Sequence, residues 1–172
     1  MFKEKIILKK SKINNLGMFA SENIKKGETI CLMKGVEKTI PELKREIFEG
    51  RERINDPFQI TNRTYLDLKK PYLLFNHSCD PNAGIKGKNE LFAIRNIKKG
   101  EEITYDYSTT SWEEDWKLDD DEEFSMRCNC GAKNCRKIIT DFCYLDKKTK
   151  EKYLKIGALP DFILKKLNEQ HS

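Results

Sequence analysis

The sequence predicts a mostly β protein built from several small sheets. Brief β-like runs recur along the chain, and each is bounded by Asn, Asp, Gly or Pro. Only residues 40–50 show helical spacing in the first part of the chain. The chain has 172 residues, most simply one domain. A domain of this size buries roughly two-thirds of its unfolded surface, so no extra cross-link is needed merely to fold.

The expected strands are all short. In chain order they cover residues 5–8, 28–33, 57–60, 64–68, 72–76, 90–95 and 102–107. The stretch Asn14-Asn15-Leu16-Gly17 predicts a tight connection after the first strand, since Asn and Gly tolerate positive φ. We expect no internal repeat.

Residues 40–50 are expected to form the first helix. Thr39 and Glu42 have the spacing of a capping box, Pro41 falls in the first turn, and Gly50 ends the helix. Two further helices are expected over residues 146–155 and 160–168. The last one carries an apolar patch that should dock on the body, formed by Phe162, Ile163, Leu164 and Leu167.

Composition favours an intracellular protein, either cytoplasmic or nuclear. Apolar residues make up 38% of the chain and charged residues 35%. No apolar run reaches the roughly 18 residues that a membrane span requires, and the N-terminal region lacks the apolar core of a signal peptide. In a reducing compartment, cysteines more often bind metal than form disulfides.

Charge is unevenly distributed. The net charge is +5, yet residues 113–123 contain eight acids and one lysine. This acidic segment is either a solvated loop or an attractive wall for a basic peptide, because charged clefts concentrate ligands of opposite sign. The remaining lysines are scattered, so they indicate at most a weak nucleic-acid contact.

Three cysteines indicate a zinc site. Cys128, Cys130 and Cys135 form C-x-C-x4-C, with Gly131 supplying the turn. Zinc accepts thiolate ligands at about 2.3 Å in a tetrahedron, and structural sites are four-coordinate. One ligand is therefore missing from this cluster, and the candidates are Cys31, Cys79, Cys143 and His77.

Of the candidate fourth ligands, Cys79 is favoured. Cys31 lies inside an apolar strand, where a free cysteine usually behaves as a small hydrophobe, and Cys143 has aromatic neighbours that suggest core packing. Cys79 ends a strand just before a proline turn, where a thiol can project outward. Zinc would then clasp the C-terminal segment onto the stretch FNHSCDPN, residues 75–82.

Four motifs occur in a familiar order: NNLGMFASENIKKGE, FNHSCDPNAG, IRNIKKGEEITYDY and CNCGAKNC, which begin at residues 14, 75, 94 and 128. Together they resemble the SET-domain protein-lysine methyltransferases with a cysteine-rich post-SET end. Their joint occurrence is specific, and they cover most of residues 11–140. The compact chain is similar to small microbial or viral members of that family.

The resemblance implies a SET fold, in which small β-sheets surround a pseudoknot. The NHSC segment is expected to thread beneath a loop made by GEEITYDY. The implied parts are a SET domain over residues 1–124, a zinc-binding post-SET segment over 125–140, and a C-terminal helical extension over 141–172 that packs on the same domain.

The resemblance also implies the site and its ligands. S-adenosylmethionine should bind on one face, while the target lysine of a basic protein enters through a narrow channel from the other. The expected donor-binding residues are Asn15, Leu16, Gly17, Met18, Asn76, His77 and Tyr107. Tyr107 and Tyr105 are expected to be catalytic. The expected zinc ligands are Cys79, Cys128, Cys130 and Cys135.

The chemistry explains why such a site is aromatic. The reference pKa of lysine is about 10.4, so the amine must lose its proton before it attacks. A dry channel lined by Tyr105, Tyr107 and Phe58 disfavours the charged form. No strong base is then needed, and alignment of the reactants can supply roughly 7–11 kcal/mol. A Tyr105 hydroxyl can hold a water where an added methyl would go, which predicts mainly monomethylation.

Three departures from the family pattern stand out. Asn15 replaces the first glycine of the donor turn, Leu73-Leu74 replaces an Arg-Phe pair, and a channel tyrosine expected before Phe58 is absent, with Asp56 nearest. The main alternative function is a non-catalytic, zinc-containing SET-like module that binds protein partners. A zinc-bearing nucleic-acid binder ranks below it. The substrate could be histone-like, ribosomal or another basic protein, in a monomer or a dimer.

Overall fold

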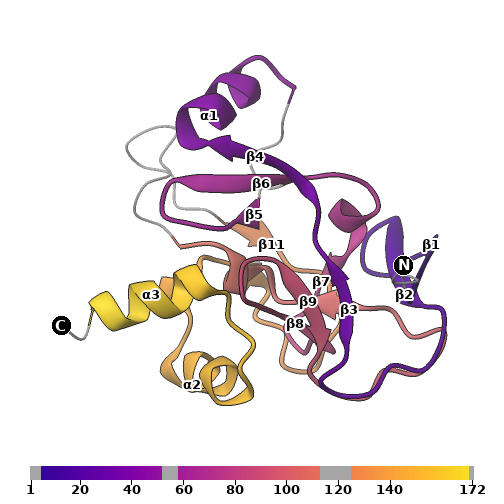
Figure 1. Cartoon of the computed structure of the whole chain (residues 1–172). Helices are drawn as coiled ribbons and strands as arrows, with labels where there is room; N and C mark the ends of the chain where they lie inside the picture. Colours follow the sequence, from indigo (N-terminus) through magenta and orange to yellow (C-terminus); the bar gives the residue numbers. More distant parts are fainter. Residues whose placement is uncertain (1–4, 52–57, 113–124, 171–172) are drawn as a thin grey trace.

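The computed structural model in Figure 1 describes residues 5–51, 58–112 and 125–170. It confirms the mostly β prediction. The described strands form five small sheets, none with more than three strands. Two three-stranded sheets make the body, in the orders β3-β9-β8 and β4-β6-β5, and three two-stranded pairs, β1-β2, β10-β7 and β11-β12, complete it.

The strands have the following bounds. The N-terminal hairpin contains β1 (Ile6–Lys10) and β2 (Leu16–Ala20). The first body sheet contains β3 (Thr29–Leu32), β8 (Ala83–Lys86) and β9 (Glu90–Ala93). The second contains β4 (Gly35–Thr39), β5 (Phe58–Gln59) and β6 (Thr64–Leu68). The remaining pairs are β7 (Asn76–His77) with β10 (Thr104–Tyr105), and β11 (Met126–Arg127) with β12 (Ile138–Ile139).

All three expected α-helices are present: α1 (Ile40–Phe48), α2 (Lys147–Ile156) and α3 (Asp161–Glu169). The Glu42 carboxylate accepts a hydrogen bond from the Thr39 backbone N–H at 2.7 Å, as the capping-box spacing predicts. No helix of the described residues is long and apolar enough to cross a membrane.

The strand expected over residues 72–76 is wrong for most of its length. Tyr72–Leu74 is a short 3-10 helix, and the strand that follows it, β7, contains two residues. Pro71 explains the difference, because it has no N–H for a strand ladder and its ring fixes φ in a range that suits turns. The Pro71 carbonyl accepts the Leu74 N–H at 2.9 Å and so closes the turn.

A short internal repeat joins the N-terminal part to the body. The expectation of no internal repeat was therefore wrong. The hexapeptide NIKKGE occurs at residues 23–28 and again at 96–101. The two copies pair antiparallel through Ile24 and Ile97, which exchange N–H···O hydrogen bonds of 2.8 Å in both directions. The two copies therefore meet around an approximate two-fold axis.

Two large hydrophobic clusters fill most of the interior, and a third, smaller one contains Cys79, Cys128 and Ile139. The larger lies among the sheets of the body and includes Met18, Phe58, Phe75 and Tyr105. The second lies beneath the C-terminal helices, which pack on the side of the molecule away from the β1–β2 hairpin (Figure 1). Phe162 and Ile163 of the expected docking patch are buried and Leu167 packs against them, whereas Leu164 is 38% exposed.

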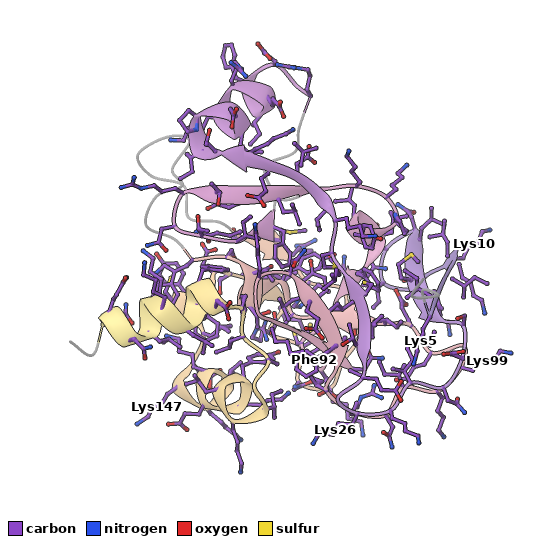
Figure 2. The ribbon with its side chains drawn as sticks, in the orientation of Figure 1. Lys5, Lys10, Lys26, Phe92, Lys99 and Lys147 are labelled. Atoms are coloured by element: carbon purple, nitrogen blue, oxygen red, sulfur yellow. The ribbon has the colours of Figure 1, made fainter. Side chains whose placement is uncertain are left out.

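Basic side chains are spread over the surface rather than gathered on one face. Figure 2 shows Lys10 and Lys99 pointing outward near the N-terminal hairpin, Lys26 at a different edge, and Lys147 on α2 at the opposite side.

Candidate functional site

Two remote stretches of chain run side by side at the centre of the candidate site. β7 and β10 pair in parallel, with Asn76 opposite Thr104 and His77 opposite Tyr105. The Ser78 N–H continues the ladder by donating to the Tyr105 carbonyl at 3.1 Å. We call this arrangement of residues 75–79 and 102–107 the crossing.

The Asn76 side chain ties the crossing to the start of β2, directly after the turn at Asn15. Its Nδ2 donates to the Leu16 carbonyl at 2.9 Å and to Glu102 Oε1 at 2.7 Å. The Glu102 carboxylate also accepts from Ser11 Oγ at 3.0 Å. The expected donor-binding residues of the turn therefore lie against Asn76. Glu102, which our sequence analysis did not select, is the acceptor that holds them there.

The backbone of this turn explains two of its residues. Asn15 has φ of 38°, a left-handed conformation that Asn adopts more readily than most residues. A Cβ on Gly17 would lie 2.2 Å from Glu102 Oε1 and 2.9 Å from Asn76 Nδ2. Gly17 thus allows the Glu102 and Asn76 side chains to approach the backbone, and a larger residue would displace them. Met18, the last residue of the expected set, is buried in the core behind the turn.

Asn82 is a second residue that sequence reasoning missed. It is buried, its Nδ2 donates to the Glu102 carbonyl at 2.7 Å, and its Oδ1 accepts the Thr104 N–H at 2.9 Å. The side chain therefore substitutes for a strand partner along the second stretch of the crossing. The only sequence signal was its place within FNHSCDPNAG.

The structure brings the two expected catalytic tyrosines together. The rings of Tyr105 and Tyr107 have centroids 5.0 Å apart, and the ring of His77 lies 5.4 Å from that of Tyr107. The Tyr107 hydroxyl donates to the Phe75 carbonyl at 2.6 Å, which fixes the orientation of the ring. Tyr105 is buried and belongs to the same cluster as Phe58, whereas Tyr107 is partly exposed. These aromatic side chains can form one wall of a channel.

Asp106, between the two tyrosines, is the most heavily bonded carboxylate of the site. Arg136 donates to both of its oxygens, at 2.8 and 2.7 Å, and the Tyr153 hydroxyl donates to Oδ2 at 2.7 Å. Burial lowers the pKa of Arg136, but its hydrogen bonds to Asp106 outweigh that effect and raise it. Burial and the nearby Asp106 charge raise the pKa of Tyr153, so this side chain remains a hydroxyl donor.

His77 is neutral at the centre of the crossing. Burial lowers its pKa to about 4, with Arg136 adding to that effect and Asp106 opposing it. Its Nδ1 accepts the Tyr107 N–H at 3.1 Å. Its Nε2 lies 3.3 Å from Cys79 Sγ. The ring therefore connects the Tyr107 backbone to the cysteine cluster.

Sulfur atoms from both ends of the site converge next to His77. Cys79 Sγ and Cys128 Sγ are 3.7 Å apart, and Cys130 Sγ accepts the Cys79 N–H at 3.5 Å. The ligand atoms of His77, Cys79, Cys128 and Cys130 all lie within 4.8 Å of one another. Cys135 packs in the same cluster, and its Sγ lies 3.8 Å from the Cys128 carbonyl.

The chemistry of this cluster fits zinc. Four bonds of about 2.3 Å in a tetrahedron place neighbouring sulfurs about 3.8 Å apart, close to the 3.7 Å between Cys79 and Cys128. Burial raises the pKa of Cys79 to about 11, while hydrogen bonds overcome burial and lower that of Cys130 to about 7. A zinc ion bound among these sulfurs would favour the thiolate form that it requires of its ligands. Cys79, Cys128 and Cys130 could hold one, with Cys135 or His77 as the fourth ligand.

The comparison with protein families decides the classification. The model of the SET domain matches residues 15–108, which contain Asn15, the start of β2 and the whole crossing. The chain belongs to the SET-domain family. The SET match contains Cys79 but ends before Cys128, Cys130 and Cys135, so β11, β12 and the C-terminal helices lie beyond it.

Curated relatives of this SET domain are much longer proteins. Histone-lysine N-methyltransferase 2B of Homo sapiens is 30% identical over 151 residues, covering 80% of this chain but 5% of that protein. An H3 lysine-4 specific histone-lysine N-methyltransferase of Aspergillus oryzae is 29% identical over 155 residues, covering 80% of this chain and 12% of the fungal protein. The chain thus spans a small part of the length of these relatives.

A solved structure shares the SET fold. A humanised mutant of the Chaetomium thermophilum Polycomb Repressive Complex 2, bound to an inhibitor, aligns with a TM-score of 0.54 at 25% identity. The alignment covers 61% of this chain and 15% of that one.

The acidic segment 113–123 and Asp56, both named above from the sequence, lie outside the described residues.

Proposed function

We propose that this SET domain transfers a methyl group from S-adenosylmethionine to the side-chain amine of lysine in a basic protein. The observation that carries the proposal is the crossing itself. It places the partly exposed Tyr107 between Tyr105 and the neutral His77, next to the turn that Asn76 holds. The printed names of the relatives, histone-lysine N-methyltransferases, support a histone-like substrate.

The donor would bind against the turn and the crossing. In this proposal Asn15, Leu16, Gly17 and Met18 line it, while Asn76, His77 and Tyr107 hold it from the crossing. The donor supplies an electrophilic methyl group on a sulfonium. Two contacts fix the backbone here. Asn76 donates a hydrogen bond to the Leu16 carbonyl, and the Glu102 carboxylate packs directly against Gly17. A pre-formed site of this kind loses little entropy on binding.

The lysine would enter against Tyr107, Tyr105 and Phe58. The aromatic wall disfavours an ammonium, so the amine would release its proton to water before its lone pair attacks. The new N–C bond would form as the methyl C–S bond breaks, and the donor would leave as a neutral thioether. The Tyr107 hydroxyl, fixed by the Phe75 carbonyl, would orient the amine toward the methyl carbon. No described residue has to act as a strong base in this scheme.

The methylation state would be set by Tyr105. Its side chain is buried within 5.0 Å of the Tyr107 ring, measured between centroids. A water held by its hydroxyl would occupy the room that a second methyl needs, so monomethyl-lysine is the expected main product. Replacing Tyr105 by Phe should raise the share of dimethyl- and trimethyl-lysine. Trimethyl-lysine as the main product of the unchanged protein would defeat this part of the proposal.

Zinc would clasp the crossing to the segment after it. We propose Cys79, Cys128, Cys130 and Cys135 as ligands. The Nδ1 of His77 accepts the Tyr107 N–H, so the ring proton is on Nε2, the nitrogen that faces Cys79. His77 would therefore be hydrogen-bonded beside Cys79 rather than bound to the metal. The proposed parts are then a SET domain over 1–124, a post-SET segment over 125–140 and an extension over 141–172. A Cys130→Ser protein that keeps full activity without bound zinc would contradict the clasp.

The function is tested by incubating the protein with donor labelled on the methyl group and a panel of basic proteins, including histones and ribosomal proteins. Label should appear on lysine, located by mass spectrometry of peptides, and Tyr107→Phe should transfer little under the same conditions. Calorimetry with the unlabelled donor separates the alternatives. Absence of donor binding would instead support a non-catalytic SET-like module that binds protein partners. A histone-like substrate implies an intracellular setting, in the cytoplasm or nucleus.

A further inference from the structure

The C-terminal helices, beyond the matched SET region, are docked tightly on the body. The Phe142 N–H donates to the Ser111 carbonyl at 3.0 Å, and the Asp161 N–H donates to the Gly87 carbonyl at 2.8 Å. A Cβ on Gly84 of β8 would lie 2.6 Å from Ala158 Cβ, so the loop before α3 lies directly on that strand. This contact surface holds α2 at a fixed distance from the crossing.

One side chain of α2 reaches into the candidate site. Tyr153 is 1% exposed, and its hydroxyl donates to Asp106 Oδ2 at 2.7 Å. Asp106 stands between Tyr105 and Tyr107, and its Oδ1 accepts the Ser108 N–H at 3.1 Å. This bond caps the short helix that begins at Tyr107. The position of the Asp106 carboxylate therefore fixes the backbone on which Tyr107 stands.

Asp106 has little freedom once all its donors are in place. A carboxylate offers about four lone-pair sites. Arg136 donates to both oxygens, Ser108 N–H to Oδ1 and the Tyr153 hydroxyl to Oδ2. Without the Tyr153 hydroxyl, Oδ2 keeps only the Arg136 hydrogen bond among the described contacts. The carboxylate could then rotate or tilt toward Arg136, and the cap on Tyr107 would follow it.

We propose that Tyr153 is a positioning residue for methyl transfer, through which the C-terminal extension holds Asp106 and so the catalytic segment in place. The inference rests on the proposed function, because Tyr153 does not touch the expected position of donor or lysine. It adds a residue from outside the matched SET region to the machinery. Small displacements of a reacting group lower the rate by large factors. The Tyr153 hydroxyl can therefore affect methyl transfer through Asp106, without touching the reactants itself.

The test compares Tyr153→Phe with Tyr144→Phe. Both variants lose one tyrosine hydroxyl from the C-terminal extension. Tyr144 serves as the control because its side chain is half exposed, whereas that of Tyr153 is buried against Asp106. Phe keeps the ring contacts of Tyr153 and removes only the hydrogen bond to Asp106. We expect kcat of Tyr153→Phe to fall about tenfold, in the range seen when an outer hydrogen-bond partner of a functional group is removed. The KM for the protein substrate and the Kd of the donor should change less than about threefold, and Tyr144→Phe should leave all three unchanged.

Amide hydrogen exchange gives a readout that does not depend on activity. Faster exchange over residues 105–110 is expected in Tyr153→Phe, with unchanged exchange within α2. Failure of the unchanged protein to transfer methyl groups would reject the proposed function, whereas the exchange result tests Tyr153 by itself. Unchanged exchange over 105–110 or full kcat would overturn the positioning role. A Tyr153→Phe protein that does not fold, or that loses donor binding and kcat in parallel, would also overturn it, since the hydroxyl would then serve folding alone.

Discussion

The two copies of NIKKGE offer a comparison within one chain, since the same six residues lead to different outcomes. In both copies the glycine has positive φ, 88° at Gly27 and 82° at Gly100. In both, the asparagine side chain accepts a backbone N–H from the other copy at 2.8 Å, Asn96 from Lys26 and Asn23 from Lys99. Identical sequence thus gives the same turn twice.

The residues after the two copies have different roles. After the first copy the chain enters β3 with Thr29, an exposed residue at the edge of the body sheet. After the second it continues with Glu102, which accepts hydrogen bonds from Asn76 and Ser11, and then with the tyrosines of the crossing. The comparison teaches that the turn depends on the six residues themselves. The site depends on the residue after the turn, because Glu102 bonds side chains from distant parts of the chain.

The largest expected difference is between Glu102→Ala and Thr29→Ala. Removing the Glu102 carboxylate takes away one of the two acceptors of the buried Asn76 amide, the other being the Leu16 carbonyl. Hydrogen bonds to charged groups contribute about 1.5–3 kcal/mol to stability. We expect a loss of about 2 kcal/mol and roughly tenfold weaker donor binding. Thr29→Ala removes an exposed hydrogen bond to Glu90 and should cost about 0.5–1 kcal/mol. Urea unfolding and calorimetry measure both quantities, and equal losses at the two positions would refute the comparison.

The next difference separates stability from activity. Gly27→Ala and Gly100→Ala each place a side chain in the left-handed region, which costs about 1–2 kcal/mol. A Cβ meets no neighbour within 4 Å at either glycine, so backbone strain should be the whole effect and the two losses should be similar. Turnover should fall several-fold only for Gly100→Ala, because only the second copy leads into the crossing. A matching fall in Gly27→Ala would show that the turns act on activity through global stability.

The smallest expected difference concerns the last residue of each copy under acidic conditions. A hydrogen bond from Lys5 holds the pKa of Glu28 below its usual 4.5. Burial raises that of Glu101, but hydrogen bonds from the Lys98 N–H, Arg95 and Asn82 lower it more. Carboxylates whose pKa is lowered on folding stabilise the protein above the unfolded pKa, and this contribution is lost as the pH falls through the folded pKa.

Both Glu28→Gln and Glu101→Gln should therefore reduce the loss of stability below about pH 4.5. We expect the larger reduction from Glu101→Gln, because its carboxylate also bonds Asn82 beside the crossing, at 3.2 Å. Melting temperatures measured for the three proteins across the acid range test this. A larger effect at Glu28 would mean that its pair with Lys5 stabilises the protein more than the contacts of Glu101 with Arg95, Lys98 and Asn82 do.

Much of the local structure could be predicted from the sequence. The capping box of α1, the strained turn at Asn15 and the C-terminal helices all depend on neighbouring residues. The nearness of Cys79 to Cys128 followed from counting zinc ligands, because a metal demands a set number of donors whatever the distance along the chain. The strand expected over 72–76 was wrong because a single proline turned the chain.

The supporting residues of the site could not be predicted in the same way. Asn82, Glu102 and Asp106 look like ordinary polar residues in the sequence, and their roles come from partners 20 or more residues away, such as Tyr153 for Asp106. Only the threading of the chain brings these groups into contact. Such pairs carry no periodicity or spacing that a single sequence reveals.

Tyr107→Phe tests the central claim most directly, through the Kd of the donor and the rate of methyl transfer to lysine measured on the same preparation. The hydroxyl should orient the reactants without holding the donor, so the rate should fall at least about a hundredfold while Kd changes less than about threefold. A variant with full activity, or one in which rate and donor affinity fall by the same factor, would contradict a methyl-transfer site built at the crossing.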